Sequence, residues 1–526
     1  MGRDWRFLAA VAVLTIVAVV RVASTHRALS ITIDEPAHLG DGYHWFDGKY
    51  AFDPSHPPLA RVLCALPLRL AGVPAATTGS EIDRGHAVLA HGGDYEANLA
   101  RARRGNLVLL VLAIAATAAW ARRHFSRGVA ILAVALFTTL PPLLAHAALI
   151  TTDLAVTATL PLALLALEVL LDSPSLRHST LFGAAVGLGL LAKMSFLVYF
   201  PAAAAVVLAA RWPVRVNWRS IAASAMAALL VLWAGYRFTF GKPSDISRDA
   251  VFLFHYAAPQ PLIPLARALA QTPLPAPAYA LGVATLAFRD KHLGHPGYFL
   301  GQTSARGWWY YFPLILFFKT PIPFLVFAAW GIGCAVLARS RVHLAYAGVA
   351  LIILLIGMTA SLNMGIRHIL PIYAPLSILA AHGVMEIRRR ATTAFSRVSL
   401  AAMLVWIFAG VALAHPDYLP WFNELAPENP AYISVDSNLD WGQDAARLAH
   451  TSRELGIGTL HVAVLATLNF ERYGVHVVPL EPYVRTSGWV AVSETRLALD
   501  AEEYRWLSLY RPVRRIGKSI RLYFIP

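Results

Sequence analysis

Long apolar runs separated by short polar stretches dominate the chain up to residue 414. A helix that crosses the hydrocarbon core of a bilayer needs about 20 apolar residues, within a range of about 17 to 25. Eleven apolar segments approach this length, so the pattern predicts eleven membrane-spanning helices. The segments are 7–24, 105–121, 129–148, 153–171, 180–194, 196–210, 220–236, 310–337, 343–360, 369–386 and 398–414.

Two of these assignments leave an alternative open. The fifth and sixth segments meet at Lys193 and Ser195 in "GLLAKMSFLVYF", and they are either two helices or one long helix with a break. The first segment, in "RDWRFLAAVAVLTIVAVVRVAS", also has the basic start and the apolar centre of a signal peptide. Cleavage there would leave the following loop on the same side of the membrane.

The pattern changes after residue 415. The apolar runs shorten to the length of strands in "TLHVAVLA", "GVHVVPL", "GWVAVSE" and "IRLYFIP", and "DWGQDAARLAHTSREL" has the spacing of a helix. We therefore expect two domains. Residues 1–415 form a polytopic α-helical membrane domain, and residues 416–526 form a small soluble α/β domain.

Composition supports the membrane assignment. Hydrophobic residues make up 57% of the chain and charged residues only 14%, with a mean hydropathy of +0.55. Soluble domains carry about 25% charged residues, so most of this surface should face lipid. The two cysteines, Cys64 and Cys334, form no CxxC pattern and predict neither a disulfide framework nor a cysteine metal site.

The placement of the positive charge predicts the orientation. Fifteen Arg residues lie in the short segments 1–6, 122–128, 172–179, 211–219, 338–342 and 387–397, whereas the loop 25–104 has eight Lys or Arg beside nine acids. Short loops rich in Lys and Arg stay in the cytoplasm. The N-terminus should then be cytoplasmic, and the loops 25–104 and 237–309 and the domain 416–526 should lie outside the cell membrane. The net charge of +15 thus reflects topology rather than a nucleic-acid partner.

The first outer loop contains the densest chemistry. Residues 33–63 read "IDEPAHLGDGYHWFDGKYAFDPSHPPLARVL". Asp34 is our candidate general base, although an Asp before Glu-Pro is also typical of a helix cap. Glu35 would point about 100° away on a helix and is expected to support catalysis or bind the acceptor. His56 precedes Pro57 and is biased toward an extended conformation, which could hold its ring toward the membrane surface.

The loop also contains His and Asp residues of the kinds that bind metal ions, but their spacing along the chain is not the close spacing of a metal-binding motif. The candidates are His38, His44, Asp53 and His56. We therefore expect a reaction that needs neither a metal ion nor a cofactor.

Charged residues inside or beside the spans are further candidates. A central Lys or Arg costs about 2.5–3.5 kcal/mol on the insertion scale, and such residues usually mark function. Lys193, Lys319 and Arg367 are of this kind, and His368 follows Arg367 at the outer edge of the tenth span. Arg367 could simply snorkel, but it could also bind a lipid phosphate. Asp153 lies at the outer mouth of the fourth span, as an N-cap, a catalytic acid, or both.

These motifs together resemble a known clan. Relatives share an Asp-Glu pair soon after the first span and a His- or Lys-Pro-Pro-Leu element about twenty residues later, which here are Asp34–Glu35 and His56–Leu59. This loop resembles the first external loop of GT-C membrane glycosyltransferases, above all the protein O-mannosyltransferases and the bacterial aminoarabinose transferases. "HAALITTDLAVTATLPL", "GLGLLAKMS" and "NMGIRHILPIYAPL" are weaker matches, and "SNLDWGQD" looks like a signature of a bacterial branch.

The resemblance implies a GT-C fold and a reaction. Such enzymes transfer a monosaccharide, here a hexose or a pentose, with inversion from a polyprenyl-phosphate donor to a hydroxyl of a protein, lipid or glycan outside the membrane. Protein glycosylation and cell-envelope synthesis are the corresponding processes. The catalytic residues would be Asp34, Glu35 and Asp153, and the donor phosphate would be bound by Arg367, His368, His56 and Lys319.

Two other classes fit part of the pattern. A transporter or flippase for lipid-linked sugars would also have many spans and charges within them, but transporters often show internal repeats and midplane sites. Here the polar residues gather at the outer face and no repeat is visible. A non-catalytic scaffold would not need Asp34, Arg367 and the His-Pro-Pro-Leu element together.

Overall fold

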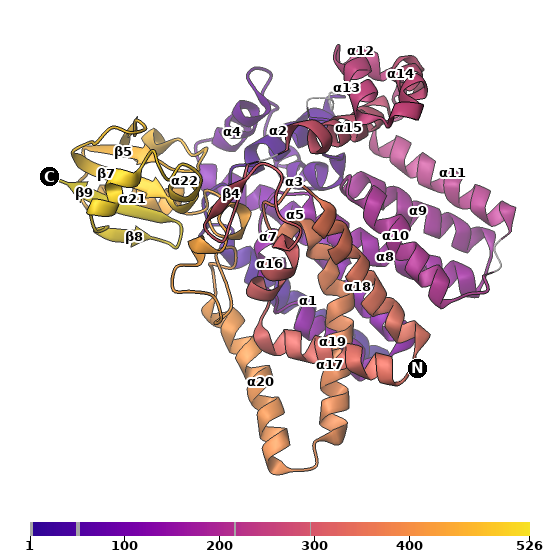
Figure 1. The fold of residues 1–526 in the computed structure, drawn as a ribbon. Helices are drawn as coiled ribbons and strands as arrows, with labels where there is room; N and C mark the ends of the chain where they lie inside the picture. Colours follow the sequence, from indigo (N-terminus) through magenta and orange to yellow (C-terminus); the bar gives the residue numbers. More distant parts are fainter. Residues whose placement is uncertain (1–3, 49–52, 215–216, 295) are drawn as a thin grey trace.

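A computed structural model of the chain describes residues 4–48, 53–214, 217–294 and 296–526 (Figure 1). Arg3 and Arg215, two of the arginines behind the predicted orientation, lie outside the described residues. The described chain contains a series of apolar helices: α1 (Asp4–Thr25), α5 (Tyr95–His124), α6 (Arg127–Phe137), α7 (Pro141–Ala147), α8 (Asp153–Asp172), α9 (Leu176–Ala192), α10 (Phe196–Ala210), α11 (Trp218–Gly235), α16 (Tyr311–Lys319), α17 (Ile322–Leu337), α18 (Arg341–Thr359), α19 (Tyr373–Arg390) and α20 (Ala394–Leu413).

The expected polytopic helical fold is confirmed. Within the described part of the chain, seven helices are long and apolar enough to cross a membrane, and the bent pairs α6–α7 and α16–α17 raise the number to nine. The shorter apolar helices α9 and α10 account for the remaining two expected segments. Lys193 lies in the break between α9 and α10, so this stretch is two helices.

The segment 310–337 is not the single helix that the apolar pattern predicts. It divides into α16 and α17, which meet at an angle of 116°. Pro321 causes the break, because proline lacks an N–H and pushes the preceding residue into an extended conformation. Thr320 has that conformation, with φ −115° and ψ 136°. The position of Pro321 therefore predicts the break in this segment, whereas the continuous apolar pattern predicts a single helix.

Burial distinguishes the central helices from those at the lipid boundary. The apolar windows of α8 and of Ile366–Arg390 are 72% and 83% buried within the protein, whereas those of α1 and α20 are only 11% buried. The large apolar surfaces of α1 and α20 must therefore be covered by lipid. The helix α8, which packs against α5, α9 and α10, occupies the interior and carries Asp153 at its first position.

Short helices cover one end of the bundle. The loop 25–104 forms α2 (Glu35–Phe46), α3 (Pro58–Leu70) and α4 (Glu81–Ala90). Prolines in the first turns of α2 and α3, and a Ser80–Asp83 capping box in α4, explain where these helices begin. The loop 237–309 forms α12 (Pro243–Ile246), α13 (Ala250–Ala257), α14 (Ile263–Gln271), α15 (Pro277–Phe288) and the strand pairs β1 (Phe240–Gly241) with β2 (Leu274–Pro275) and β3 (Gly297–Phe299) with β4 (Gln302–Ser304).

A five-stranded mixed sheet of order β6-β5-β7-β9-β8 lies near the C-terminus. The four strands and the helix expected there are present: β5 (Thr459–Ala463), β6 (His476–Pro479), β7 (Gly488–Ser493), β9 (Ile520–Ile525) and α21 (Ala445–Glu454); the sheet region also contains α22 (Glu494–Leu499). The edge strand β8 (Arg514–Ile516) escaped prediction, because a three-residue charged strand has no apolar run to reveal it.

The C-terminal region is joined to the rest of the molecule by shared cores. Tyr418, Leu419 and Trp441 belong to the same core as the membrane helices. The sheet shares a second core with the loop 25–104, in which Leu39 and Leu448 both take part. Figure 1 shows the sheet beside α4. The segment between α20 and the sheet thus lies at the same end of the bundle as α2 to α4, where the candidate residues are.

Candidate active site

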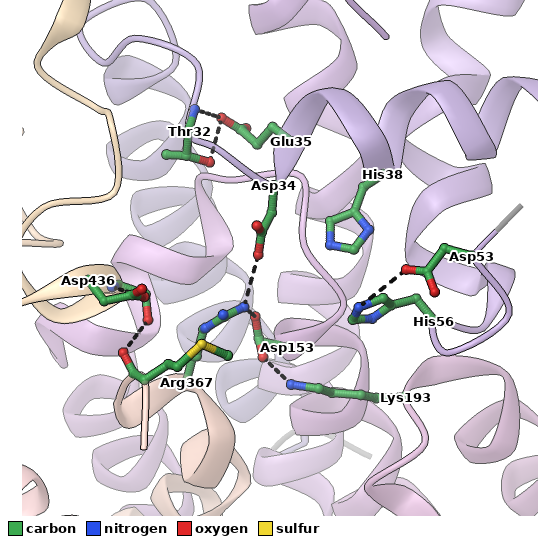
Figure 2. Close-up of polar contacts among 12 residues, drawn as sticks. Thr32, Asp34, Glu35, His38, Asp53, His56, Asp153, Lys193, Arg367 and Asp436 are labelled. Atoms are coloured by element: carbon green, nitrogen blue, oxygen red, sulfur yellow. Dashed lines mark hydrogen bonds and ion pairs between the residues drawn. The ribbon is translucent and has the colours of Figure 1, made fainter. Parts of the chain in front are cut away.

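Asp34 lies immediately before α2, at the position of the N-cap, but its side chain makes no capping hydrogen bond. The carboxylate turns instead toward Arg367 (Figure 2). Its Oδ2 accepts a hydrogen bond from Arg367 Nη1 at 3.4 Å, and the side chain stays 37% exposed. Asp34 is therefore available to a ligand and is not occupied in capping a helix.

Arg367 lies in η3 (Ile366–Ile372), the 3₁₀ turn that precedes α19. Its guanidinium group is between two carboxylates, because Nη1 also lies 3.8 Å from Asp153 Oδ2. The guanidinium stacks over the ring of Trp441, 4.4 Å from its centroid. Arg367 is thus positioned by contacts with two carboxylates and one aromatic ring.

Asp153 and Lys193 extend this line of alternating charges. Asp153 is 1% exposed at the start of α8, and it accepts a hydrogen bond from Lys193 Nζ at 2.5 Å. Lys193 reaches it from the break between α9 and α10, where its backbone is extended. The resulting order is Asp34, Arg367, Asp153 and Lys193, as Figure 2 shows.

The surroundings of Asp34 make it a better base. Burial raises the pKa of Asp34, the positive charge of Arg367 opposes this, and the negative charges of Asp436 and Asp153 add to the rise. A general base works best when its pKa lies near the operating pH. A raised carboxyl pKa therefore suits removal of a proton from a hydroxyl group.

Several buried polar atoms around this line lack hydrogen-bond partners. They include Arg367 Nε, Asp153 Oδ2 and His368 Nε2. His368 contributes its carbonyl oxygen to a hydrogen bond from the Tyr199 hydroxyl at 2.8 Å, but its ring nitrogen Nε2 has no such bond. Because more than about 90% of buried polar groups in proteins are hydrogen-bonded, this concentration is typical of a site that binds a polar ligand.

His56 lies at the edge of the same site as a neutral ring. Burial and the nearby charge of Arg61 lower the pKa of His56 to about 3. Its ring meets the ring of His38 edge-on at 4.9 Å, and Arg61 Nε donates a hydrogen bond to His38 Nδ1 at 3.1 Å. His56 can therefore offer a hydrogen bond to a phosphate, but it does not supply the positive charge that a lysine would.

Glu35 lies apart from this group. Its side chain is 0% exposed, and Arg103 Nε and Nη2 donate to its two oxygens at 2.8 and 2.7 Å. The backbone N–H groups of Thr32 and Ile150 donate to the same carboxylate at 2.8 and 2.9 Å. These four hydrogen bonds to Glu35 fix the backbone conformation of the loop that carries Asp34.

Lys319 also has its donors occupied by the protein. It is 1% exposed at the bend between α16 and α17. Its Nζ donates to the carbonyl oxygens of Leu419 and Asn438 at 2.7 and 2.8 Å, and it lies 4.3 Å from the centroid of the Phe422 ring. Lys319 therefore ties the segment after α20 to the bundle, and the structure does not bring it to Asp34.

The structure adds residues that the sequence interpretation did not select. Lys193 is a charge within the spans that the sequence does not assign to the site. Trp441 lies within "SNLDWGQD" and Asp436 directly before it, a stretch that the sequence marks only as a family signature, and the sequence pattern does not select Arg61. The signal for Trp441 was present in that motif, but its spatial neighbour Arg367 is 74 positions away in the chain.

The described residues contain no group of three or more His, Cys, Asp or Glu side chains that is arranged to hold a metal ion. The chemistry that the site can perform is therefore derived from its carboxylates, cations and neutral rings. A half-exposed carboxylate beside a guanidinium group can accept a proton next to a developing negative charge.

Comparison with known proteins agrees with this fold. Residues 96–236 match the model of the family described as dolichyl-phosphate-mannose-protein mannosyltransferase. None of the curated proteins compared with the chain matches it. The crystal structure of ArnT from Cupriavidus metallidurans in the apo state superposes with a TM-score of 0.50 and 14% identity, over 99% of this chain and 98% of that one.

Two further structures are similar at the same level of identity. ArnT from Cupriavidus metallidurans bound to undecaprenyl phosphate gives a TM-score of 0.49 at 14% identity, over 99% and 98% of the two chains. The Archaeoglobus fulgidus oligosaccharyltransferase tethered to an acceptor peptide gives 0.48 at 13% identity, over 92% of this chain and 62% of that one. The apo ArnT match supports a multi-pass membrane fold of the GT-C type. The family-model match over residues 96–236 agrees with the expected resemblance to the protein O-mannosyltransferases.

Proposed function

We propose that this protein transfers a monosaccharide, with inversion, from a polyprenyl-phosphate donor to an acceptor hydroxyl at the outer face of the membrane. One observation carries the proposal: a single guanidinium group, that of Arg367, lies 3.4 Å from the half-exposed Asp34 and 3.8 Å from the buried Asp153. A base and a cation side by side suit a reaction in which a hydroxyl loses its proton while a phosphate departs.

The reaction is a single displacement. Asp34 takes the proton of the acceptor hydroxyl, whose oxygen attacks the anomeric carbon from the face opposite the phosphate. The bond between that carbon and the phosphate oxygen breaks, and its electron pair leaves with the phosphate. Because only one displacement occurs, the configuration at the anomeric carbon inverts, and the proton remains on Asp34.

Positive charge stabilises the departing phosphate. Arg367 has a free Nε–H for a phosphate oxygen, and charge-assisted hydrogen bonds of this kind are about twice as strong as neutral ones. Asp153, 1% exposed, holds Lys193 and Arg367 at a fixed separation. His368 and the neutral His56 add hydrogen bonds, while Glu35 positions the loop of Asp34 and Lys319 positions the C-terminal segment.

The donor class and the orientation belong to the same proposal. ArnT has been crystallised with undecaprenyl phosphate, so we take a polyprenyl phosphate as the carrier, bearing a hexose or a pentose. The acceptor is a protein, lipid or glycan hydroxyl. The arginine-rich short loops support a cytoplasmic N-terminus and an outer site, with residues 416–526 also outside.

Incubation of the purified protein with radiolabelled undecaprenyl-phosphate hexoses and pentoses tests this proposal. We expect the label to leave the lipid, to water or to an acceptor. Asp34→Asn should retain its fold and lose about 10²- to 10⁴-fold in rate, whereas Asp47→Asn, an exposed carboxylate of the same loop, should match the wild type. Full activity in folded Asp34→Asn overturns the role of Asp34. Movement of intact donor across a vesicle without cleavage would instead identify a transporter.

A further inference from the structure

The segment from Ser434 to Asp444 forms one wall of the site. Asn438 Oδ1 accepts a hydrogen bond from the N–H of Ile366 at 3.0 Å, and Ser437 Oγ donates to the carbonyl of Met364 at 2.9 Å. A Cβ on Gly365 would lie 2.3 Å from Ser437 Oγ, so only glycine allows this close approach. The backbone next to Arg367 is thereby fixed by the C-terminal segment.

Asp436 has an unusual conformation within this wall. Its φ is +53°, in the left-handed region that few non-glycine residues adopt. Hydrogen bonds hold it there: its N–H donates to Thr495 Oγ1 at 3.2 Å, and its carbonyl accepts from the N–H of Asp440 at 2.8 Å. Strained residues that the surrounding structure holds in place cluster at functional sites.

The carboxylate of Asp436 is only partly used by the protein. One oxygen accepts a hydrogen bond from the Ser437 N–H at 2.5 Å, and within the described ranges no cation lies at ion-pairing distance. Figure 2 shows Asp436 on the side of Arg367 away from Lys193. Its carboxylate therefore lies beside Arg367, on the side of the site that the segment from Ser434 to Asp444 forms.

We propose that Asp436 accepts a hydrogen bond from a hydroxyl group of the substrate, carried either by the transferred sugar or by the acceptor. This inference rests on the proposed function. Arg367 and Lys193 are already matched by Asp34 and Asp153, so a third carboxylate repels the donor phosphate and does not bind it. A neutral hydroxyl donates to a carboxylate without that repulsion, and the bond is charge-assisted.

Asp436→Asn tests the inference, because asparagine tolerates the left-handed backbone. Asp436→Gly is a second variant that removes the carboxylate and relieves the backbone. Binding is measured for undecaprenyl phosphate alone and for undecaprenyl-phosphate hexoses and pentoses, followed by transfer to a Ser/Thr peptide, a diacylglycerol and a free hexose. The matched control is Glu428→Gln, an exposed carboxylate in the stretch that leads from α20 to this wall.

We expect both Asp436 variants to bind undecaprenyl phosphate as the wild type does. If the hydroxyl belongs to the sugar, affinity for the sugar-bearing donor falls about 10- to 100-fold. If it belongs to the acceptor, donor binding and hydrolysis are unchanged while the KM for the acceptor rises by a similar factor.

Three outcomes would overturn the inference. If both variants bind every lipid and transfer to every acceptor as the wild type does, Asp436 does not bind the substrate. Equal loss of binding to undecaprenyl phosphate and to its sugars indicates a structural defect and also overturns the inference. A wild-type protein that binds none of these lipids overturns the proposed function itself, and the two failures differ because in this case the unmodified protein is inactive.

Discussion

Two adjacent carboxylates, each facing an arginine, have different surroundings in this molecule. The Glu35–Arg103 pair is 0% exposed on both sides, with hydrogen bonds of 2.7 and 2.8 Å. The Asp34–Arg367 pair has one contact of 3.4 Å, and Asp34 is 37% exposed. The residue types are nearly the same, but the first pair is closed to ligands and the second is open.

The difference lies in how many hydrogen-bonding groups the protein itself satisfies. Arg103 also donates to the backbone carbonyls of His26, Leu29 and Ser30, each at 2.8 Å. Arg367 keeps a buried Nε without a partner. A buried ion pair with all its hydrogen bonds formed stabilises one loop conformation, whereas an incompletely satisfied pair retains the capacity to bind substrate. In the proposed mechanism, Glu35 therefore positions the loop and Asp34 serves as the base.

Breaking the closed pair should have the largest effect on stability. Glu35→Gln leaves Arg103 as an uncompensated buried charge, which typically costs about 3–5 kcal/mol. We expect the free energy of unfolding to fall by this amount in detergent-solubilised protein, measured by denaturant unfolding. Asp34→Asn is the control and should change it by less than about 0.5 kcal/mol. Equal losses in the two variants would contradict the distinction.

Changing the open pair should affect catalysis and leave folding nearly intact. Arg367→Lys keeps the charge, but an ammonium group cannot contact Asp34 and Asp153 together and stack on Trp441. We expect kcat/KM to fall about 10- to 100-fold, with little change in the unfolding midpoint. Arg103→Lys should do the reverse, lowering the amount of folded protein but not the activity per folded molecule.

The pH dependence of activity should identify the open carboxylate. Burial raises the pKa of Asp34, and the active form of a base is the deprotonated one. The value of kcat/KM should therefore fall about tenfold per pH unit as the pH drops below this raised pKa. The acid limb should remain in a folded Glu35→Gln sample and vanish in Asp34→Asn.

The smallest effect is expected at the edge of the site. Burial and Arg61 lower the pKa of His56 to about 3, so the ring is neutral at physiological pH. His56→Gln retains a neutral hydrogen-bond donor and should reduce kcat/KM by about two- to tenfold at most. A pH–rate profile that shows a limb near the ordinary histidine value of about 6.5, lost in His56→Gln, would contradict a neutral His56.

Local pattern predicted the elements well where one physical rule dominated. Apolar helices or helix pairs occupy all eleven predicted segments of the described chain, although only seven helices, or nine with the two bent pairs, meet the length requirement. The alternation of short apolar runs located four strands of the sheet. The apolar pattern missed the bend at Pro321, because the apolar content of 310–337 continues across a local backbone break. It missed β8, because Arg514–Ile516 owes its place to pairing with β9 and not to its own hydrophobicity.

For the site, the sequence identified candidate residues whose side-chain chemistry suits catalysis or phosphate binding. A short motif after the first span selected Asp34, the resemblance at the mouth of the fourth span selected Asp153, and the cost of charges near a bilayer selected Arg367. The sequence alone predicted Asp34 as the base with Glu35 in a supporting or acceptor-binding role, and it placed Lys319 rather than Lys193 at the donor phosphate, although each pair shares its chemistry and its setting in the chain. Distant partners decide which member of each pair has its hydrogen-bonding groups satisfied within the protein. Arg103 satisfies Glu35, and the carbonyls of Leu419 and Asn438 satisfy Lys319. Only the tertiary structure brings these partners within hydrogen-bonding distance, so only it decided which charges are used by the fold and which remain for a substrate.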